Sequence, residues 1–370
     1  MAVWHYNMKD SSRKEEIGQY LKKIKPEIDR TIEKYLPKKV SKKWLESTFG
    51  KPRYTYYIKA AQKTLLEPSW ELLERGGKRW RPVLFLLIAE VFGADLKKLK
   101  EFTIIPEVIH NGTLCIDDIE DQGELRRGKP ALHKIFGIDI ALNVGNFLYF
   151  LPLLILFKKR KKVKTEILIK AYEAYFQEMV RLHFGQGTDI FWHKGKEKKI
   201  TEKEYLQMTA FKTGCMARLA AKLAVIFSGK NGQLAEKIGN LAESIGVAFQ
   251  IQDDILDITL TGKERERFGK IPGNDIKEGK RTLMVIYTLK KATKKDKKRL
   301  LEILNKHTDD RREKEEAIRI IQKYGGIEYA KKLAKKIIKE NWQETEKLLP
   351  PSEAKIKLKE FINYLIERRV

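Results

Sequence analysis

The chain has 370 residues, of which 42% are hydrophobic and 34% charged, and this apolar content argues against a globally disordered protein. Its formal net charge of +26 predicts attraction to polyanions, whether nucleic acid, anionic membranes or phosphorylated small molecules. The two cysteines, Cys115 and Cys215, form no CxxC pair, which argues against a disulfide framework or a zinc site and favours a cytoplasmic protein.

The first predicted element is a lysine-rich amphipathic helix that Pro37 ends. Its apolar residues recur every three or four positions and therefore share one face. Such a stripe predicts a helix that caps the core, and the alternative is a helix that binds a membrane surface or a partner. We expect residues 1–40 to form a basic helical extension and residues 41–370 to form one domain. The stripe comprises Ile17, Leu21, Ile24, Ile28, Ile32 and Tyr35.

Helical periodicity continues along the rest of the chain, and strand-like alternation is nearly absent. Gly76 and Gly77 break the pattern, whereas Pro82 and Pro106 each suit a first helical turn. The predicted fold class is therefore all-α, a single bundle of about ten or more helices. Helices are expected over residues 44–75, 81–91, 104–121, 165–190, 201–229, 233–260, 281–305 and 312–346.

The most apolar run is FLYFLPLLILF, residues 147–157, and Pro152 interrupts it. It is shorter than the roughly 20 apolar residues that a bilayer-spanning helix needs. The adjoining basic run, residues 158–162, has two interpretations. It is either an anchor for anionic lipid or the solvated loop at the end of a buried helix.

Two DDxxD sequences stand out, each with two aspartates four residues apart on one helix face and a third beside them. A mostly apolar helix does not gather three aspartates without a cation nearby. Carboxylate oxygens suit Mg²⁺, which shares its remaining ligand positions with water and substrate phosphates. One such sequence could be a solvated helix end, but two favour a metal site. The aspartates are Asp117, Asp118 and Asp121 in the first cluster, and Asp253, Asp254 and Asp257 in the second.

Cationic residues recur near these clusters. The sequence GGKRWRP places two cations after a double glycine and before a helix start, where backbone and helix terminus both favour an anion. Each cation alone is typical of a protein surface, but together they supply the countercharge for a diphosphate–metal complex. They are Lys78, Arg81, Arg126, Arg127, Lys212, Lys270 and Lys280.

With these motifs the chain resembles the trans-type polyprenyl diphosphate synthases, all-α enzymes that lengthen an allylic diphosphate with isopentenyl diphosphate. The resemblance rests on GGKRWRP, HNGTLCIDDIEDQGELRRGKP, FGQGTDI, FKTGC, FQIQDDILD and GKIPGNDIKEGKRT, in family order between about residues 45 and 300. It implies helices around a deep central cavity, a homodimer, and three Mg²⁺ ions when substrate is bound.

The resemblance also implies roles for single residues. Asp117, Asp121 and Asp253 would ligate Mg²⁺ most directly, with Asp118, Asp254 and Asp257 as ligands or just behind them. Lys212, Thr213 and Gln250 would be catalytic, because the hydroxyl and amide stabilise the allylic carbocation. Isopentenyl diphosphate would be bound by Lys78, Arg81, His110 and Arg127. The allylic diphosphate would face Arg126, Lys212, Lys270 and Lys280, with Gln186 and Asp189 lining the same cavity.

Product length should depend on what closes the cavity below the first DDxxD. Family members with short products often carry aromatic residues four or five positions before it, where this chain has Thr113 and Gly112. One helical turn, about 5.4 Å, further down lie Val108 and Ile109. The resemblance thus implies a linear all-trans product of C20 (geranylgeranyl) or C25 (geranylfarnesyl). Alternatively, the floor comes from Phe147, Tyr149 and Phe150.

Two other functions remain open from the sequence. A class I terpene cyclase also uses DDxxD, but its second motif is usually of an Asn/Ser/Glu kind. A non-catalytic, regulatory basic subunit would explain the charge, but such partners typically lose aspartates. No nucleic-acid-binding motif occurs, so no nucleic-acid partner is expected. The charge excess favours peripheral contact with an anionic membrane in addition to soluble substrates.

Overall fold

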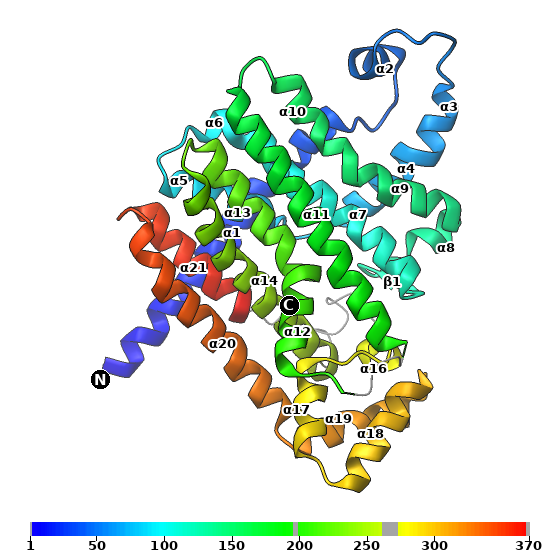
Figure 1. The fold of residues 1–370 in the computed structure, drawn as a ribbon, viewed down its shortest axis with the longest axis vertical. Helices are drawn as coiled ribbons and strands as arrows, with labels where there is room; N and C mark the ends of the chain where they lie inside the picture. The colour runs from blue at the N-terminus through cyan, green and yellow to red at the C-terminus, as the bar shows by residue number, and fades with distance from the viewer. Residues whose placement is uncertain (1, 195–198, 261–272, 368–370) are drawn as a thin grey trace.

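The computed structural model describes residues 2–194, 199–260 and 273–367, with side chains from residue 15 onward, and these residues are almost entirely helical (Figure 1). This confirms the predicted all-α class. The described strands are β1 (Leu125–Arg126) and β2 (Lys129–Pro130), a short antiparallel hairpin beyond the first acidic cluster.

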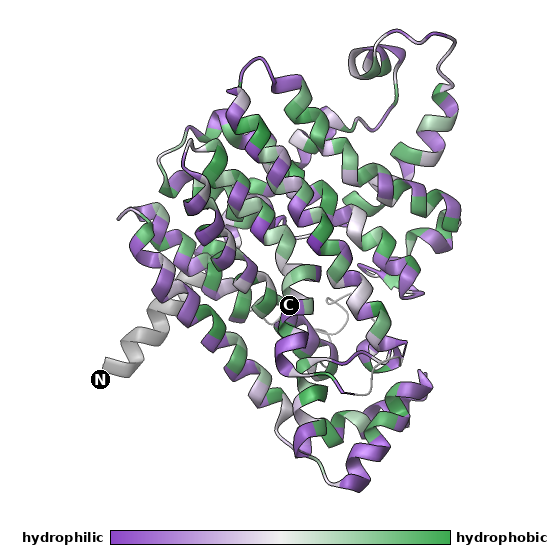
Figure 2. Cartoon of the chain, viewed as in Figure 1, coloured by the Kyte–Doolittle hydropathy of each residue, from purple (hydrophilic) through white to green (hydrophobic). Residues whose placement is uncertain are grey.

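The central helices form one bundle. Helix α13 packs against α5, α11 and α14, and α7 packs against α9. Each residue of α13 is buried, and Figure 2 shows hydrophobic and hydrophilic residues interspersed along the helices of the bundle. The central helices are α5 (Trp80–Val91), α7 (Ile104–Glu120), α9 (Ile138–Phe150), α11 (Thr165–His193), α13 (Cys215–Phe227) and α14 (Gly232–Thr259).

An outer layer covers the bundle. Helix α1 (Ala2–Tyr35) packs against α21 (Glu353–Glu367) and α5, and α20 (Gly326–Thr345) lies along α14. The apolar stripe of α1 is buried in the same core as the central helices, with Ile28 and Ile32 almost inaccessible. Helix α1 therefore caps the core, and the domain boundary near residue 40 stays a prediction.

The remaining elements are short helices that connect or extend these layers. In chain order they are α2 (Lys42–Phe49), α3 (Ile58–Ala61), η1 (Gln62–Leu66), α4 (Glu67–Glu74), α6 (Leu96–Leu99), η2 (Lys100–Thr103), α8 (Leu132–Phe136), η3 (Leu151–Leu153), α10 (Leu154–Lys159), α12 (Glu202–Thr209), η4 (Ala210–Gly214), α16 (Asn274–Lys277), α17 (Leu283–Lys291), α18 (Lys294–Lys306), α19 (Arg311–Lys323) and η5 (Glu346–Leu348).

Three predicted long helices are broken in the structure. The segment 44–75 was predicted as one helix, but α2 ends at Gly50, whose positive φ of 87° is the conformation that glycine adopts freely. Thr293 caps α18 with its side chain and separates it from α17. Gly325, with φ 74°, separates α19 from α20. These predictions of unbroken helices were wrong because the apolar periodicity does not reveal where one helix ends, as long as the next helix also buries one apolar face.

The apolar run lies in a longer helical stretch than predicted. Helix α9 continues through η3 into α10, and the 22 residues Ile138–Lys159 are long and apolar enough by composition to cross a membrane. Half of the most apolar window is buried inside the protein, and a buried core helix passes the same test. The finding is therefore only a weak indication of a membrane span.

Helices α7 and α9 approach closely at Gly112. A Cβ atom there would lie 2.8 Å from the carbonyl oxygen of Gly145 and 3.1 Å from side-chain atoms of Leu148 and Tyr149. Gly112 therefore faces α9. From the sequence, Gly112 was expected to be among the residues that influence how the cavity closes below the first DDxxD, but a larger side chain there would press against α9 instead of narrowing the cavity.

We expect Gly112→Ala to lower the free energy of unfolding by about 1–3 kcal/mol, the usual cost of overpacking a tight contact. Thermal and denaturant unfolding would measure it. Gly18→Ala on α1 is the matched control, because a Cβ there meets nothing within 4 Å, and Ala is the better helix former. If Gly112→Ala stabilised the protein as much as Gly18→Ala does, the close approach of α7 and α9 would be refuted.

Candidate functional site

A cavity of ≈650 Å³ opens among the central helices and brings together most of the predicted site residues. Asp118 and Asp121 line a small adjoining hollow, Asp257 of the second cluster is buried and lines neither space, and Lys270 lies outside the described residues. The predicted residues that line the main cavity are Lys78, Arg81, His110, Thr113, Asp117, Arg126, Arg127, Gln186, Asp189, Lys212, Thr213, Gln250, Asp253, Asp254 and Lys280.

A π-helical turn, η4, presents Lys212 and Thr213 to the cavity. The wider turn is packed tightly between α11 and α14. A Cβ at Gly185 would lie 2.3 Å from the Lys212 backbone nitrogen, and one at Gly246 would lie 2.6 Å from the Gly214 Cα. Glycines on both neighbouring helices therefore make room for this turn. Single π turns inside α-helices often occur at functional sites, because they redirect side chains.

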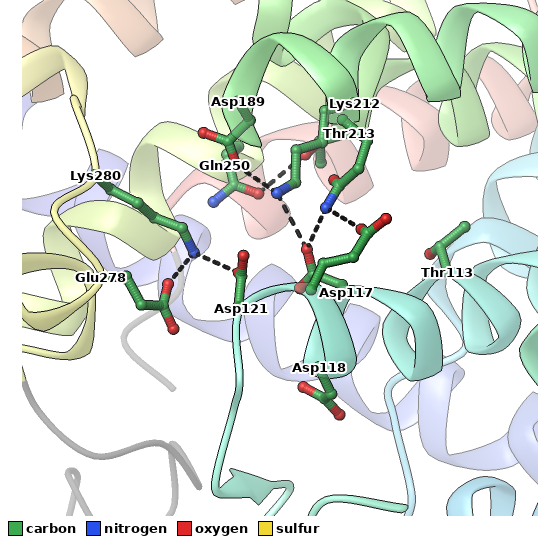
Figure 3. Close-up of polar contacts among 12 residues, drawn as sticks. Thr113, Asp117, Asp118, Asp121, Asp189, Lys212, Thr213, Gln250, Glu278 and Lys280 are labelled. Atoms are coloured by element: carbon green, nitrogen blue, oxygen red, sulfur yellow. Dashed lines mark hydrogen bonds and ion pairs between the residues drawn. The ribbon is translucent and has the colours of Figure 1, made fainter. Parts of the chain in front are cut away.

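Lys212 connects three helices through carboxylates (Figure 3). Its Nζ lies 2.6 Å from Asp189 Oδ2 on α11 and 3.1 Å from Asp117 Oδ1 on α7. Gln186 donates from Nε2 to the same Asp117 oxygen at 3.2 Å. Burial alone would lower the pKa of Lys212, but Asp117 and Asp189 raise that pKa above its ordinary value. Conversely, Lys212 and its neighbours hold the pKa of Asp117 well below the usual range, although burial opposes them.

Lys280 plays the matching role at Asp121. Its Nζ lies 3.2 Å from Asp121 Oδ2 and also pairs with Glu278 (Figure 3). The other carboxylate oxygen of Asp121, Oδ1, is buried and has no hydrogen-bond partner. Burial would lower the pKa of Lys280, but the surrounding carboxylates raise it well above its ordinary value.

The remaining aspartates are engaged by the protein itself. Asp118 points away from Asp117 (Figure 3). It accepts three hydrogen bonds from the Arg126 guanidinium, two at Oδ1 and one at Oδ2. Asp257 Oδ2 accepts the backbone N–H of Asp275 at 3.2 Å and so anchors the start of α16. Asp254, with both oxygens bonded, is held by Tyr205 and Gln250.

The Asp254 network orients the amide of Gln250. Tyr205 donates its hydroxyl to Asp254 Oδ2 at 2.9 Å, and Gln250 Nε2 donates to Asp254 Oδ1 at 2.8 Å. Gln250 Oε1 therefore faces Thr213, whose hydroxyl donates to it at 3.0 Å. Sequence reasoning missed Tyr205, because it precedes Lys212 on a separate helix, α12, and belongs to no charged cluster.

A second set of cations lines the cavity around the Gly76–Arg81 segment. Lys78, Arg81 and Arg127 belong to it, His110 lies beside them, and Glu107 is the buried carboxylate in this part of the cavity. Burial lowers the pKa values of Arg81 and Arg127 to about 10 in each case, with Glu107 opposing the shift. Burial and the neighbouring guanidiniums lower the pKa of His110 well below its usual value, so its imidazole is neutral. These cations are poised for an anion.

The apolar wall of the cavity differs from the one predicted. Thr113 lines the cavity, but Val108, Ile109 and Gly112 do not, since they pack into the core. Of the alternative floor residues, Phe150 is 64% exposed, whereas Tyr149 is buried against α11. The apolar residues that do line the cavity are Trp80, Leu114, Leu182, Met208, Met216, Phe249 and Leu256.

The chemistry of the donors suits a hard divalent cation. Asp117 and Asp253 line the cavity, and Asp121 carries a buried oxygen with no hydrogen-bond partner. Such carboxylate oxygens are the ligands that Mg²⁺ prefers. Within the described residues, no three or more His, Cys, Asp or Glu side chains already form a group that could hold an ion, and Asp117 and Asp121 each pair with a lysine.

Comparison with known proteins identifies relatives across most of the chain. Residues 62–321 match the family model described as polyprenyl synthetase. The geranylgeranyl diphosphate synthase of Methanosarcina mazei is 34% identical over 306 residues, 82% of this chain and 90% of that protein. The geranylfarnesyl diphosphate synthase of Natronomonas pharaonis is 30% identical over 321 residues, with the same two coverages. The solved geranylgeranyl pyrophosphate synthetase of Pyrococcus horikoshii superposes with a TM-score of 0.81 at 30% identity, covering 96% of this chain and 99% of that one.

We expect Tyr205→Phe to lower the free energy of unfolding by about 1–3 kcal/mol, because it leaves a buried carboxylate oxygen of Asp254 without its donor. Denaturant unfolding would measure the loss. Tyr57→Phe is the matched control, since that side chain is 73% exposed, and it should change stability by less than about 0.5 kcal/mol. Equal effects of the two variants would contradict the hydrogen bond.

Proposed function

The chain belongs to the polyprenyl synthetase family, and on that premise we propose that it condenses isopentenyl diphosphate with an allylic diphosphate. The reaction is the 1′-4 head-to-tail transfer of a prenyl group, and the product is a linear all-trans prenyl diphosphate of C20 or C25. Relatives named as geranylgeranyl and geranylfarnesyl diphosphate synthases support these two lengths.

One observation carries the proposal: a single cavity holds two cation sets of different character. Lys212, Lys280 and Arg126 alternate with the aspartates of the first cluster. Lys78, Arg81 and Arg127 have Glu107 among them. The first set suits a diphosphate bound together with divalent cations, and the second suits a diphosphate bound by protein cations alone. Two such subsites match two diphosphate substrates.

The competing functions fit this geometry less well. A terpene cyclase takes one diphosphate and has no use for the second cation set. A regulatory subunit has no need for acidic and cationic residues arranged around a lined cavity. Neither alternative is favoured by the relatives, whose names are those of synthases.

The residues of the first subsite would stabilise the leaving group. Asp117, Asp121 and Asp253 would hold Mg²⁺, which when bound supplies Lewis-acid stabilisation of the departing pyrophosphate. Lys212, Lys280 and Arg126 place positive charge where the negative charge of pyrophosphate develops. Their present partners are carboxylates, so an incoming diphosphate replaces one anion by another and leaves no lysine buried alone.

The carbocation left by ionisation meets oxygen dipoles and an apolar wall. Gln250 turns its amide oxygen toward Thr213, because Asp254 binds the amide nitrogen. The oxygen of the Gln250 amide and the oxygen of the Thr213 hydroxyl, which are the negative ends of their dipoles, are therefore available at the cavity. Leu114, Leu182 and Phe249 exclude water from the prenyl chain. The double bond of isopentenyl diphosphate then attacks, and the proton it releases passes to the pyrophosphate.

The test of the function is product analysis. Purified protein is incubated with Mg²⁺, labelled isopentenyl diphosphate and, in turn, C5, C10, C15 and C20 allylic primers, and the dephosphorylated products are sized by chromatography. A discrete C20 or C25 product is expected.

Asp253→Asn should reduce kcat by about 100-fold or more, as removal of a group that stabilises the transition state does. The control Asp309→Asn removes an aspartate that is 69% exposed and should keep full activity. A wild-type protein that elongates no primer would disprove the proposal.

We also propose a homodimer formed through α9 and α11. Large apolar side chains recur along one face of α11 at intervals of seven and four residues, and all are about half exposed or more. Exposed apolar residues on α9 adjoin them, since Tyr175 of α11 donates to the Tyr149 carbonyl of α9. An exposed apolar face this extensive is typical of an interaction surface. When this face of one copy contacts the same face of a second copy, the two form a symmetric dimer. The residues are Ile138, Leu142 and Phe150 on α9, and Ile169, Phe176, Val180, Phe184 and Phe191 on α11.

We expect wild-type protein to sediment as a dimer and Phe184→Glu to sediment as a monomer, because the substitution places a charge in the apolar interface. Ile356→Glu on α21 is the matched control, at a comparably exposed apolar residue away from the face, and should stay dimeric. If the wild-type protein is instead monomeric and co-sediments with anionic vesicles, and if Phe184→Glu abolishes this co-sedimentation, the face binds a membrane and not a second copy.

A further inference from the structure

Arg79 occupies an unusual position between two predicted diphosphate ligands, Lys78 and Arg81. Its backbone lies in the left-handed region, with φ 50° and ψ 35°, although it is not glycine. That conformation costs about 1–2 kcal/mol for an L-residue and persists only where the surroundings fix it. The side chain is 2% exposed and does not reach solvent. Contacts of the Arg79 side chain therefore determine how this segment is held.

Three acceptors from three helices hold the Arg79 guanidinium. Its Nη1 donates to Glu107 Oε1 of α7 at 3.0 Å, and its Nη2 donates to the carbonyl oxygen of Leu73 in α4 at 2.9 Å. Its Nε donates to Asp29 Oδ1 of α1 at 2.9 Å. Each nitrogen thus has its own acceptor, which fixes the plane of the guanidinium as well as its place.

Asp29 lies in the part of the chain that precedes the family match, which begins at residue 62. Its neighbours Ile28 and Ile32 are buried in the core and fix the position of α1, and Lys25 holds the second carboxylate oxygen of Asp29. The carboxylate is therefore oriented before it meets Arg79. Helix α1 thereby contacts Arg79, which lines the cavity, in addition to covering the core.

The contacts continue from Arg79 to the other side of the same subsite. Glu107 accepts a weaker bond of 3.4 Å from Asn111 Nδ2, and Asn111 Oδ1 accepts from Arg127 Nη1 at 3.3 Å. Gly77 leaves room for both guanidiniums, since a Cβ there would lie 3.1 Å from Arg127 Nη2 and 3.4 Å from Arg79 Nη1. Asp29 is thus the outer end of a chain of contacts that ends at Arg127.

We propose that Asp29 is a positioning residue for the isopentenyl diphosphate subsite, acting through Arg79. By fixing Arg79 in its left-handed conformation, it sets the directions in which Lys78 and Arg81 leave the backbone on either side. The N-terminal helix is then part of the binding machinery for that diphosphate. This inference rests on the proposed function, which assigns the subsite to isopentenyl diphosphate.

A purely electrostatic role for Asp29 predicts the opposite effect of its removal. A carboxylate near an anion site repels the anion, so its neutralisation would tighten diphosphate binding if Asp29 acted by charge alone. A positioning role predicts weaker binding, because Lys78 and Arg81 lose their fixed directions. The sign of the change in affinity therefore separates the two roles.

The test compares Asp29→Asn with wild type in two measurements: calorimetric binding of isopentenyl diphosphate without allylic substrate, and steady-state kinetics. We expect the dissociation constant and the KM for isopentenyl diphosphate to rise about fivefold to tenfold, because the asparagine amide oxygen can still accept from Arg79 but lacks the charge that strengthens this hydrogen bond. The KM for the allylic diphosphate should be unchanged, and kcat should change by a smaller factor than the KM for isopentenyl diphosphate. Glu33→Gln is the matched control, because it removes the same charge from an exposed position of the same helix and should alter neither constant.

A double-mutant cycle tests the route through Arg79. Arg79→Lys cannot bind three acceptors with a planar group and should itself weaken isopentenyl diphosphate binding. Adding Asp29→Asn to Arg79→Lys should cause no further loss. Equal losses in both backgrounds, or unchanged or tighter binding in Asp29→Asn, overturn the inference. A wild type that binds isopentenyl diphosphate but elongates no primer overturns the proposed function alone, and one that does not bind it overturns both.

Discussion

Buried charges of both signs surround the polar end of the cavity, and each must be compensated where it lies because little water reaches it. Lys212 lies between Asp117 and Asp189, and Lys280 lies between Asp121 and Glu278. The Lys212 pairs join η4 to α7 and α11, and the pair between Lys280 and Asp121 joins the segment between α16 and α17 to the end of α7. They thereby fix the relative positions of elements that are far apart in sequence. The helices bring the charges together, and the charges in turn limit how the helices can move apart.

The same pairing prepares the site for its substrates. Under the proposed function, a diphosphate bound to the lysines would take the place of carboxylates, and those carboxylates would then be available to divalent cations. Around Arg81 and Arg127 the balance is different, since Glu107 is the buried carboxylate there and burial lowers the pKa of both guanidiniums. An anion bound there would directly stabilise the buried guanidiniums. Under the proposed function, one cavity would therefore distinguish a diphosphate bound with metal from one bound without it.

Precise placement of these groups depends on residues that never carry the chemistry. Gly185 and Gly246 make room for the π-helical turn that presents Lys212 and Thr213. Tyr205, through Asp254, decides which end of the Gln250 amide faces the cavity. At the other subsite, Arg79 is held by side chains and a carbonyl from three helices. Removal of any one of these supports would leave the reacting groups present but misdirected.

The amino-acid sequence alone predicts the helical class, the two aspartate clusters and most of the cavity cations, because each follows from local spacing on one helix or from a short motif. It did not determine what each helix face meets. Gly112 faces α9 instead of the cavity, and the contacts between Asp29 and Arg79 and between Tyr205 and Asp254 join residues about 50 positions apart. Helical periodicity fixes the face on which a side chain lies, but only the packing of the helices decides which partner lies opposite.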